Sequence, residues 1–154
     1  MITLTNKIAV VTGASSGIGK ACALGLLRNG WTVALVGRRE AALQEVVAQA
    51  GEHAVRAIPI PADLTQEDAV RALFDGVQRR FGRLDLLFNN AGMSLPFALP
   101  NELSGEDWRR MVDINLNGAF YCLSHAFRLM QAQKPQGGRI INNGSISAHV
   151  PRPG

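Results

Sequence analysis

Three glycines, Gly13, Gly17 and Gly19, stand within seven positions directly after a short apolar run. The residues after them follow a helical pattern, so the glycines occupy a strand-to-helix turn. Free backbone N–H groups and the positive end of a helix dipole meet at such a turn and suit a pyrophosphate. The hydroxyls of Ser15 and Ser16 can add donors or cap the helix. The pattern predicts a dinucleotide site, and the alternative is a tight turn without a ligand.

Basic side chains follow the next apolar run, where a nucleotide site often carries an acid. A carboxylate about 20 residues after the glycines commonly holds the ribose diol of NAD. In this sequence that position is Gly37, followed by Arg38 and Arg39. Guanidinium groups attract a 2′-phosphate, which a carboxylate would repel. The two arginines therefore favour NADP(H) over NAD(H), unless they only solvate the start of a helix.

Strand-like and helix-like segments alternate along the chain, which predicts one α/β domain over residues 1–154. Pro59 lies within the third strand-like run and cannot donate to a sheet ladder, so that strand belongs at an edge. We expect a Rossmann-type doubly wound parallel sheet in the order 3-2-1-4-5. The strands are expected at 7–11, 31–36, 54–60, 84–88 and 139–143, with a capping box at 65–68 and a long helix over 104–133.

The composition is that of a globular protein, with 47% hydrophobic and 18% charged residues. The formal net charge is +4, but the basic residues are scattered without a run, so nucleic acid is not an expected partner. No apolar stretch is long enough to cross a membrane, and no secretory signal is evident. Cys22 and Cys122 have no metal-ligand spacing, so we expect no metal, two buried thiols and a reducing, cytoplasmic location.

Several motifs together resemble the classical short-chain dehydrogenase/reductase family. They are "TGASSGIG" at 12–19, Asp63, "NNAG" at 89–92, Asn115 and the pair Gly144 and Ser145. The resemblance covers nearly the whole chain, from Lys7 to Ser145. It implies an oxidoreductase that transfers hydride between NADP(H) and a small alcohol, ketone or aldehyde.

The same resemblance implies roles for individual residues. The loop from Gly13 to Gly19 would hold the pyrophosphate, Asp63 would accept a hydrogen bond from the adenine amino group, and Leu64 would lie beside the ring. The backbone at 90–92 would approach the ribose and adenine. The implied cofactor-binding residues are Gly13, Ser15, Ser16, Gly17, Ile18, Gly19, Arg38, Arg39, Asp63, Leu64, Asn90, Ala91 and Gly92.

Two further residues carry implied catalytic roles. Asn115 resembles the helix asparagine that orders a water in the proton relay. It follows Met111 by four positions, so we expect it on the apolar face of its helix and hydrogen-bonded. The alternative is an asparagine tied to a nearby carbonyl. Ser145 resembles the serine that hydrogen-bonds the reacting oxygen, with Ser147 as the competing assignment.

The family mechanism also needs a tyrosine followed four positions later by lysine, and this chain contains no such pair. The only tyrosine, Tyr121, is followed four positions later by His125. We therefore expect the 154-residue chain to be inactive and to be a fragment of a longer enzyme that forms homo-oligomers. The alternative is a non-catalytic NADP(H)-binding module.

Overall fold

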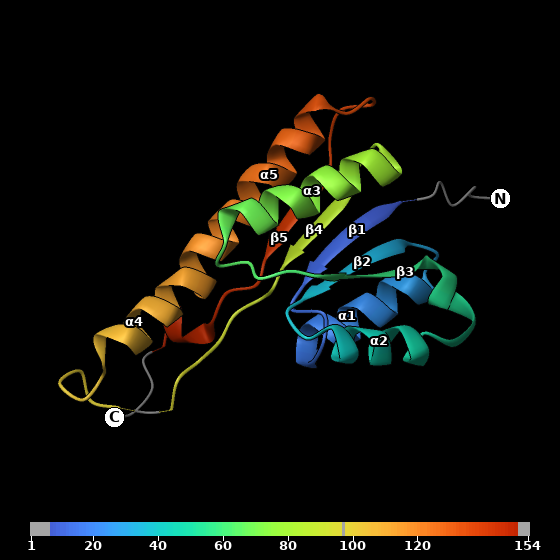
Figure 1. Ribbon diagram of the computed structural model, residues 1–154. Coiled ribbons are helices and arrows are strands. Elements are labelled where there is room, and N and C mark those ends of the chain that lie inside the picture. Colours follow the sequence, from blue (N-terminus) through green and yellow to red (C-terminus); the bar gives the residue numbers. More distant parts are fainter. Residues whose placement is uncertain (1–6, 97, 151–154) are drawn as a thin grey trace.

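The computed structural model describes residues 7–96 and 98–150, which form a five-stranded parallel sheet between two layers of helices (Figure 1). The strand order is β3-β2-β1-β4-β5, as the sequence predicts. Within the sheet, β1 is buried along its whole length because it pairs with β2 on one side and β4 on the other. The strands are β1 (Ile8–Thr12), β2 (Thr32–Gly37), β3 (Ala57–Pro61), β4 (Leu86–Asn89) and β5 (Arg139–Asn142).

Alternate residues of the central strands face two separate hydrophobic layers. Val11 and Leu35 pack with α1 (Gly17–Arg28) and α2 (Glu40–Gln49) on one face. Val10 and Ala34 pack with α3 (Glu67–Phe81) and α5 (Ala119–Ala132) on the other. This alternation explains why the strands read as continuous apolar runs, since both faces of a parallel sheet are covered.

The helix expected over 104–133 is continuous but not uniform. It consists of α4 (Gly105–Val112), a π-helical segment η2 (Asp113–Gly118) and α5, which together form one long rod (Figure 1). At its start the Ser104 hydroxyl accepts a hydrogen bond from Asp107 N at 3.0 Å. The π-helical segment was not predicted from the sequence.

Two local predictions need correction. Residues 51–56 form a 3₁₀ helix, η1 (Gly51–Arg56), so the third strand begins at Ala57 rather than at 54. Gly51 enters this helix with a φ of 56°, which favours a turn over an extended strand. The capping box at Thr65 is absent, because its hydroxyl donates to Asp63 Oδ1 at 2.9 Å and does not cap α3.

The outer edge of the sheet at β3 has few backbone N–H groups that can donate hydrogen bonds. Ala62 N donates to Gly37 O at 3.0 Å, which places the even-numbered amides of this strand toward β2. Pro59 and Pro61 therefore occupy outward-facing positions, where a missing N–H costs no ladder bond. The edge position predicted from Pro59 is confirmed.

The amino-terminal ends of three strands meet at Asp85. The Asp85 carboxylate accepts from Ile8 N at 2.9 Å and pairs with Arg83 at 2.6 Å, and Asp85 O accepts from Arg139 N at 2.9 Å. Burial alone would raise the pKa of Asp85, but the bonds from Arg83 and Ile8 outweigh it and lower the pKa below its usual value.

The two cysteines are free thiols in different environments. Cys122 lies in the core between α5 and the sheet, and burial raises the pKa of its thiol to about 12. Cys22, expected to be buried, is only half-buried, because its position on α1 faces partly outward. In the described part of the chain, no helix has the length and apolar character needed to cross a membrane.

Candidate functional site

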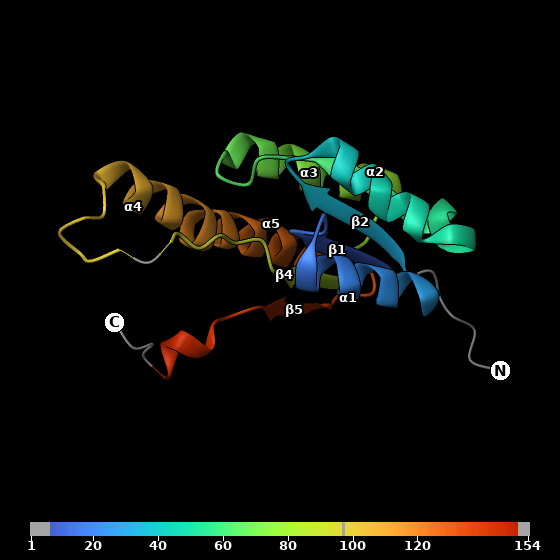
Figure 2. The same cartoon turned by 90° about the horizontal axis from the view of Figure 1, so that it is seen from below.

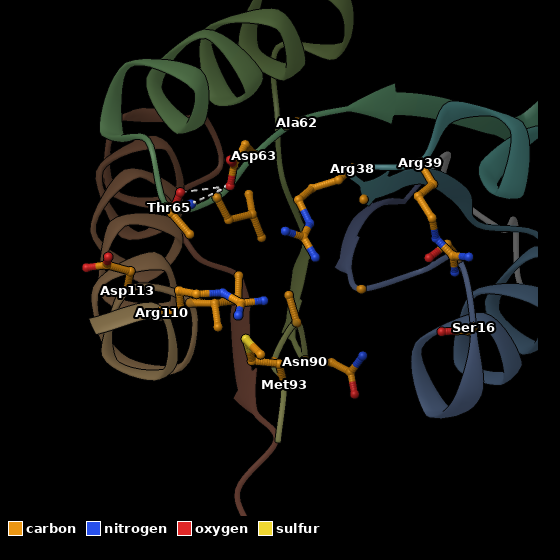
Figure 3. Close-up of a pocket in the computed structure, with 17 residues that line it drawn as sticks. Ser16, Arg38, Arg39, Ala62, Asp63, Thr65, Asn90, Met93, Arg110 and Asp113 are labelled. Carbon is orange, nitrogen blue, oxygen red and sulfur yellow. Dashed lines mark hydrogen bonds between the residues drawn. The ribbon is translucent and has the colours of Figure 1, made fainter. Parts of the chain in front are cut away.

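Two clefts open where the parallel strands end, which is the edge where α/β sheets bind ligands. The first, of about 460 Å³, lies over the ends of β1, β2, β3 and β4 (Figure 3). Its lining includes most of the residues expected to bind the cofactor, namely Gly13, Ser15, Ser16, Arg38, Arg39, Asp63, Leu64, Asn90, Ala91 and Gly92.

The second cleft, of about 770 Å³, lies between the end of β5 and the long helix rod. It brings together Asn115 and Ser145, the two residues expected to act in catalysis. The segment Asn90–Met93 lines both clefts, so one stretch of backbone after β4 separates them. A ligand that crossed this segment would occupy both clefts.

The glycines of the loop after β1 serve two different purposes. A Cβ on Gly19 would overlap Gly13 O, and a Cβ on Gly13 would come within 3.0 Å of Ala91 Cα. These two glycines therefore allow the loop to pack against the segment after β4. Gly17 has open space around it but a φ of 54°, which a side chain disfavours. Gly17, Ile18 and Gly19 are not among the residues that line the first cleft.

The start of α1 is left without a side-chain cap. Ser16 is the N-cap residue, yet its hydroxyl makes no capping bond, and the first turn contains no acidic residue. The first-turn N–H groups of a helix have no partner within the helix. They are therefore available to an anion beside the cleft.

A buried threonine at the end of β1 holds the two loops together. Thr12 Oγ1 accepts from Asn90 N and Ala91 N, both at 2.9 Å, and donates to Phe88 O at 3.4 Å. The Asn90 side chain returns the link by donating to Thr12 O at 3.0 Å. This positioning role of Thr12 was not predicted, although a hydroxyl at the end of an apolar strand indicates a residue that can bond a neighbouring loop.

The two arginines after β2 stand at the mouth of the first cleft. Figure 3 shows the Arg38 side chain directed into the cleft and the Arg39 side chain directed toward Ser16. In the described part of the chain, neither guanidinium has a hydrogen-bond or ion-pair partner. Ala14 N donates to Val36 O at 3.0 Å, which keeps the end of β2 beside the glycine loop.

The wall after β3 is formed by Asp63 and Leu64. Asp63 is exposed, and its Oδ1 accepts from Thr65 N at 3.1 Å and from Thr65 Oγ1 at 2.9 Å. These bonds fix the orientation of the carboxylate. Leu64 lines the cleft but is only 3% exposed, because it also packs in the core beside α3 and α5.

Asn115 lies within η2 and is exposed rather than buried on the apolar face, which corrects the sequence-based expectation. Its Nδ2 donates to Met93 O at 3.0 Å and its Oδ1 accepts from Met93 N at 3.1 Å. The side chain is therefore tied to a nearby carbonyl, as the alternative interpretation held. A Cβ on Gly92 would come within 2.6 Å of Asn115 Oδ1, so this pairing requires glycine there.

At the end of the π-helical segment η2, the backbone of the rod comes close to the backbone of the segment after β3. A Cβ on Gly118 would come within 2.8 Å of Leu64 O and 3.3 Å of Asp113 O. The rod therefore touches the segment after β3 at Gly118, directly beside the first cleft. Widened turns of this kind are frequent at functional sites.

Ser145 follows β5 and begins a short 3₁₀ helix, η3 (Ile146–Ala148). Its Oγ accepts from Ser147 N at 3.1 Å, which leaves the hydroxyl hydrogen available to another acceptor. Ser147 also lines the second cleft, so both candidate serines belong to the same cleft.

Asparagines join β4 to β5 below these serines. Asn89 Nδ2 donates to Ala119 O at 2.8 Å and to Asn142 Oδ1 at 3.1 Å, so its side chain links β4 to α5 and β5. Asn143 Nδ2 donates to Asn90 Oδ1 at 2.8 Å. Asn143 was not singled out from sequence, since an asparagine after a strand is usually turn chemistry.

Arg110 of α4 also lines the first cleft and was missed by the sequence analysis. It lies 47 positions after Asp63 in the chain, and only the fold brings these two residues to one wall. No local pattern distinguishes it from its neighbour Arg109.

Comparisons with known proteins agree with this geometry. The family model described as short chain dehydrogenase matches residues 7–154. A 3beta-hydroxysteroid dehydrogenase of Mediterraneibacter gnavus is 40% identical over 141 residues, which is 92% of this chain and 50% of that protein.

Two solved structures have the same fold over almost the whole of this chain. The structure titled "ElxO with NADP Bound" has a TM-score of 0.89 and 31% identity, covering 97% of this chain and 59% of that one. An NAD⁺-bound xylitol dehydrogenase has a TM-score of 0.88 and 37% identity, covering 96% of this chain and 56% of that one.

The chain spans about half to three-fifths of the length of the first relatives that it matches. The matched region nevertheless runs through both clefts, from the glycine loop after β1 to the serines after β5. On the match of the family model and on these identities, the chain belongs to the short-chain dehydrogenase family.

Proposed function

We propose that this chain is the cofactor-binding part of an NADP(H)-dependent oxidoreductase that interconverts a small alcohol and its ketone or aldehyde. The observation that carries the proposal is the pair of unpaired guanidiniums, Arg38 and Arg39, at the mouth of the first cleft. Solved relatives bind NADP in one case and NAD⁺ in another, which supports a nicotinamide dinucleotide. The basic residues favour the phosphorylated form.

The residues of the first cleft fit such a dinucleotide. The uncapped start of α1, with no acid in its first turn, suits the pyrophosphate. Arg38 and Arg39 offer planar forks to a 2′-phosphate. Asp63 keeps Oδ2 free to accept a bond from the adenine amino group, because only its Oδ1 is used by Thr65.

The residues of the second cleft fit the nicotinamide end of the dinucleotide and the substrate. The nicotinamide, when bound, supplies or accepts the hydride. The Ser145 hydroxyl, oriented by Ser147 N, is placed to donate its hydrogen to the oxygen of a carbonyl substrate. Asn115 keeps the backbone of Met93 in place between the two clefts, so we assign it a positioning role.

The choice of cofactor is tested by titrating the chain with NADPH and with NADH and measuring the binding by calorimetry. Arg38→Asp should weaken NADPH binding by roughly ten- to a hundred-fold, because it removes a charge-assisted bond and adds repulsion, and should not weaken NADH binding, because a carboxylate there can accept from the ribose diol. Arg79→Asp, an exposed change on α3, is the matched control. Absence of NADPH binding to the parent chain would refute the proposal.

Turnover is a separate question, since the chain contains no tyrosine with lysine four positions later. We expect the 154 residues to bind NADPH without oxidising it in the presence of a panel of ketones. Turnover would show that another acid replaces the tyrosine. Binding without turnover even in a version extended by the family's remaining segments would favour the non-catalytic module.

We also propose a homo-oligomer in the cytoplasm for the longer protein. The exposed apolar side chains Trp108, Phe120 and Phe127 on the helix rod support self-association. The two free thiols support a reducing compartment.

A further inference from the structure

Arg110 enters the first cleft from the side opposite the glycine loop. It belongs to α4, whereas Arg38 follows β2, and both line the same cleft. Figure 3 shows the two side chains reaching toward the middle of the cleft from different walls. The space between them is flanked by Asp63 and Thr65 after β3.

The guanidinium of Arg110 is held only weakly by its own helix. Its Nη1 pairs with Asp107 Oδ1 at 3.1 Å across one turn of α4, and both side chains are partly exposed. An exposed pair of this kind contributes little stability, and it uses one of five N–H donors. The planar face of the guanidinium remains free to contact a ligand.

The charges on the two walls of the cleft differ. The wall of Arg110 also carries Asp63 and Asp113, and Asp107 lies beside it. The opposite wall carries Arg39, Ser16 and the positive end of α1. A phosphate is therefore drawn to the second wall, while a neutral, flat ring is favoured beside a guanidinium whose charge is partly balanced.

We propose that Arg110 contacts the adenine base, packing its guanidinium against the ring on the side away from Arg38. This rests on the proposed function, since it requires a dinucleotide in the first cleft. Arg110 then contributes to affinity without selecting between cofactors, because NADPH and NADH carry the same base. Selection belongs to Arg38 and Arg39, which meet the group that differs.

The experiment compares Arg110→Gln with Arg109→Gln, which removes the same charge from the neighbouring exposed position outside the cleft. We expect Arg110→Gln to weaken NADPH and NADH binding by the same factor, about two- to five-fold for a cation–π contact at an exposed site. Arg109→Gln should leave both affinities unchanged. Thermal unfolding of both variants checks that α4 remains folded.

The outcomes separate this inference from the proposed function. If the parent chain binds NADPH and Arg110→Gln binds it equally well, the base contact is refuted while the cofactor site stands. A loss confined to NADPH would place Arg110 at the 2′-phosphate and refute the base contact. A parent chain that binds neither cofactor refutes the proposed function itself. An equal loss in both variants would assign the effect to net charge and also refute the contact.

Discussion

The two clefts lie at the same edge of the sheet but beside the ends of different strands, and they are built in different ways. The end of β1 is buried, and its loop is fixed by Thr12, Gly13 and Gly19 in contacts without spare room. The end of β5 is an exposed edge, and every residue from Ile141 to Val150 is exposed (Figure 2). The first cleft is therefore preorganised by packing, whereas the second is held on one side by a few hydrogen bonds from asparagines.

A substitution at Gly19 tests this contrast and should give the largest change in the free energy of unfolding. Gly19→Ala places a Cβ on Gly13 O, so we expect a loss of about 3 kcal/mol in the free energy of unfolding. Gly25→Ala, in the same helix with open space around it, should stabilise by roughly 0.5–1 kcal/mol. Urea unfolding measures both, and equal effects would mean that the loop is not tightly packed.

Thr12 tests the hydrogen bonds of the same region. Thr12→Val keeps the shape but removes the acceptor for Asn90 N and Ala91 N, so a loss of about 2 kcal/mol is expected. Thr12→Ser keeps the hydroxyl and loses one methyl group, which should cost about 0.8 kcal/mol. A serine variant as unstable as the valine variant would contradict the role given to the hydroxyl.

The Asp85 carboxylate tests how the start of β1 is anchored, since it accepts from Ile8 N. Its pKa is lowered in the folded chain, so its stabilising contribution is complete above about pH 4 and is lost as the pH falls through the lowered pKa. Asp85→Asn should cost about 1.5 kcal/mol at pH 7. The difference between variant and parent should shrink in acid, and a difference independent of pH would contradict this assignment.

Ser145 should give the smallest effect on stability. Its bond to Ser147 N is exposed, so Ser145→Ala should change the free energy of unfolding by less than about 0.5 kcal/mol. Chemical unfolding beside the Thr12 variants gives the comparison directly. A large loss at Ser145 would show that the second cleft is as tightly built as the first.

The fold followed from the sequence because apolar runs and helical stripes alternate clearly. Pro59 alone placed β3 at the edge. The error at 54–56 arose because these residues continue the 3₁₀ helix that begins at Gly51, and an apolar and basic run does not reveal that conformation.

The site was predictable only in part. Gly13, Arg38 and Asp63 each follow a strand, and strand ends meet at one edge, so their gathering could be expected. Arg110 and the pairing of Asn115 with Met93 depend on how far the helix rod leans over the sheet. The rod also comes close to Leu64 O at Gly118, where a Cβ would lie 2.8 Å from that oxygen, and no local pattern indicates this approach.

The prolines of β3 make the two edges of the sheet unequal in their ability to pair with a further strand. Pro59 and Pro61 remove donors from the outward-facing positions of that strand, so an incoming chain would find little to pair with there. The free side of β5 carries no such block among its residues Arg139–Asn142. We therefore expect a strand added to this sheet, from the same polypeptide or from another copy, to join at β5 rather than at β3.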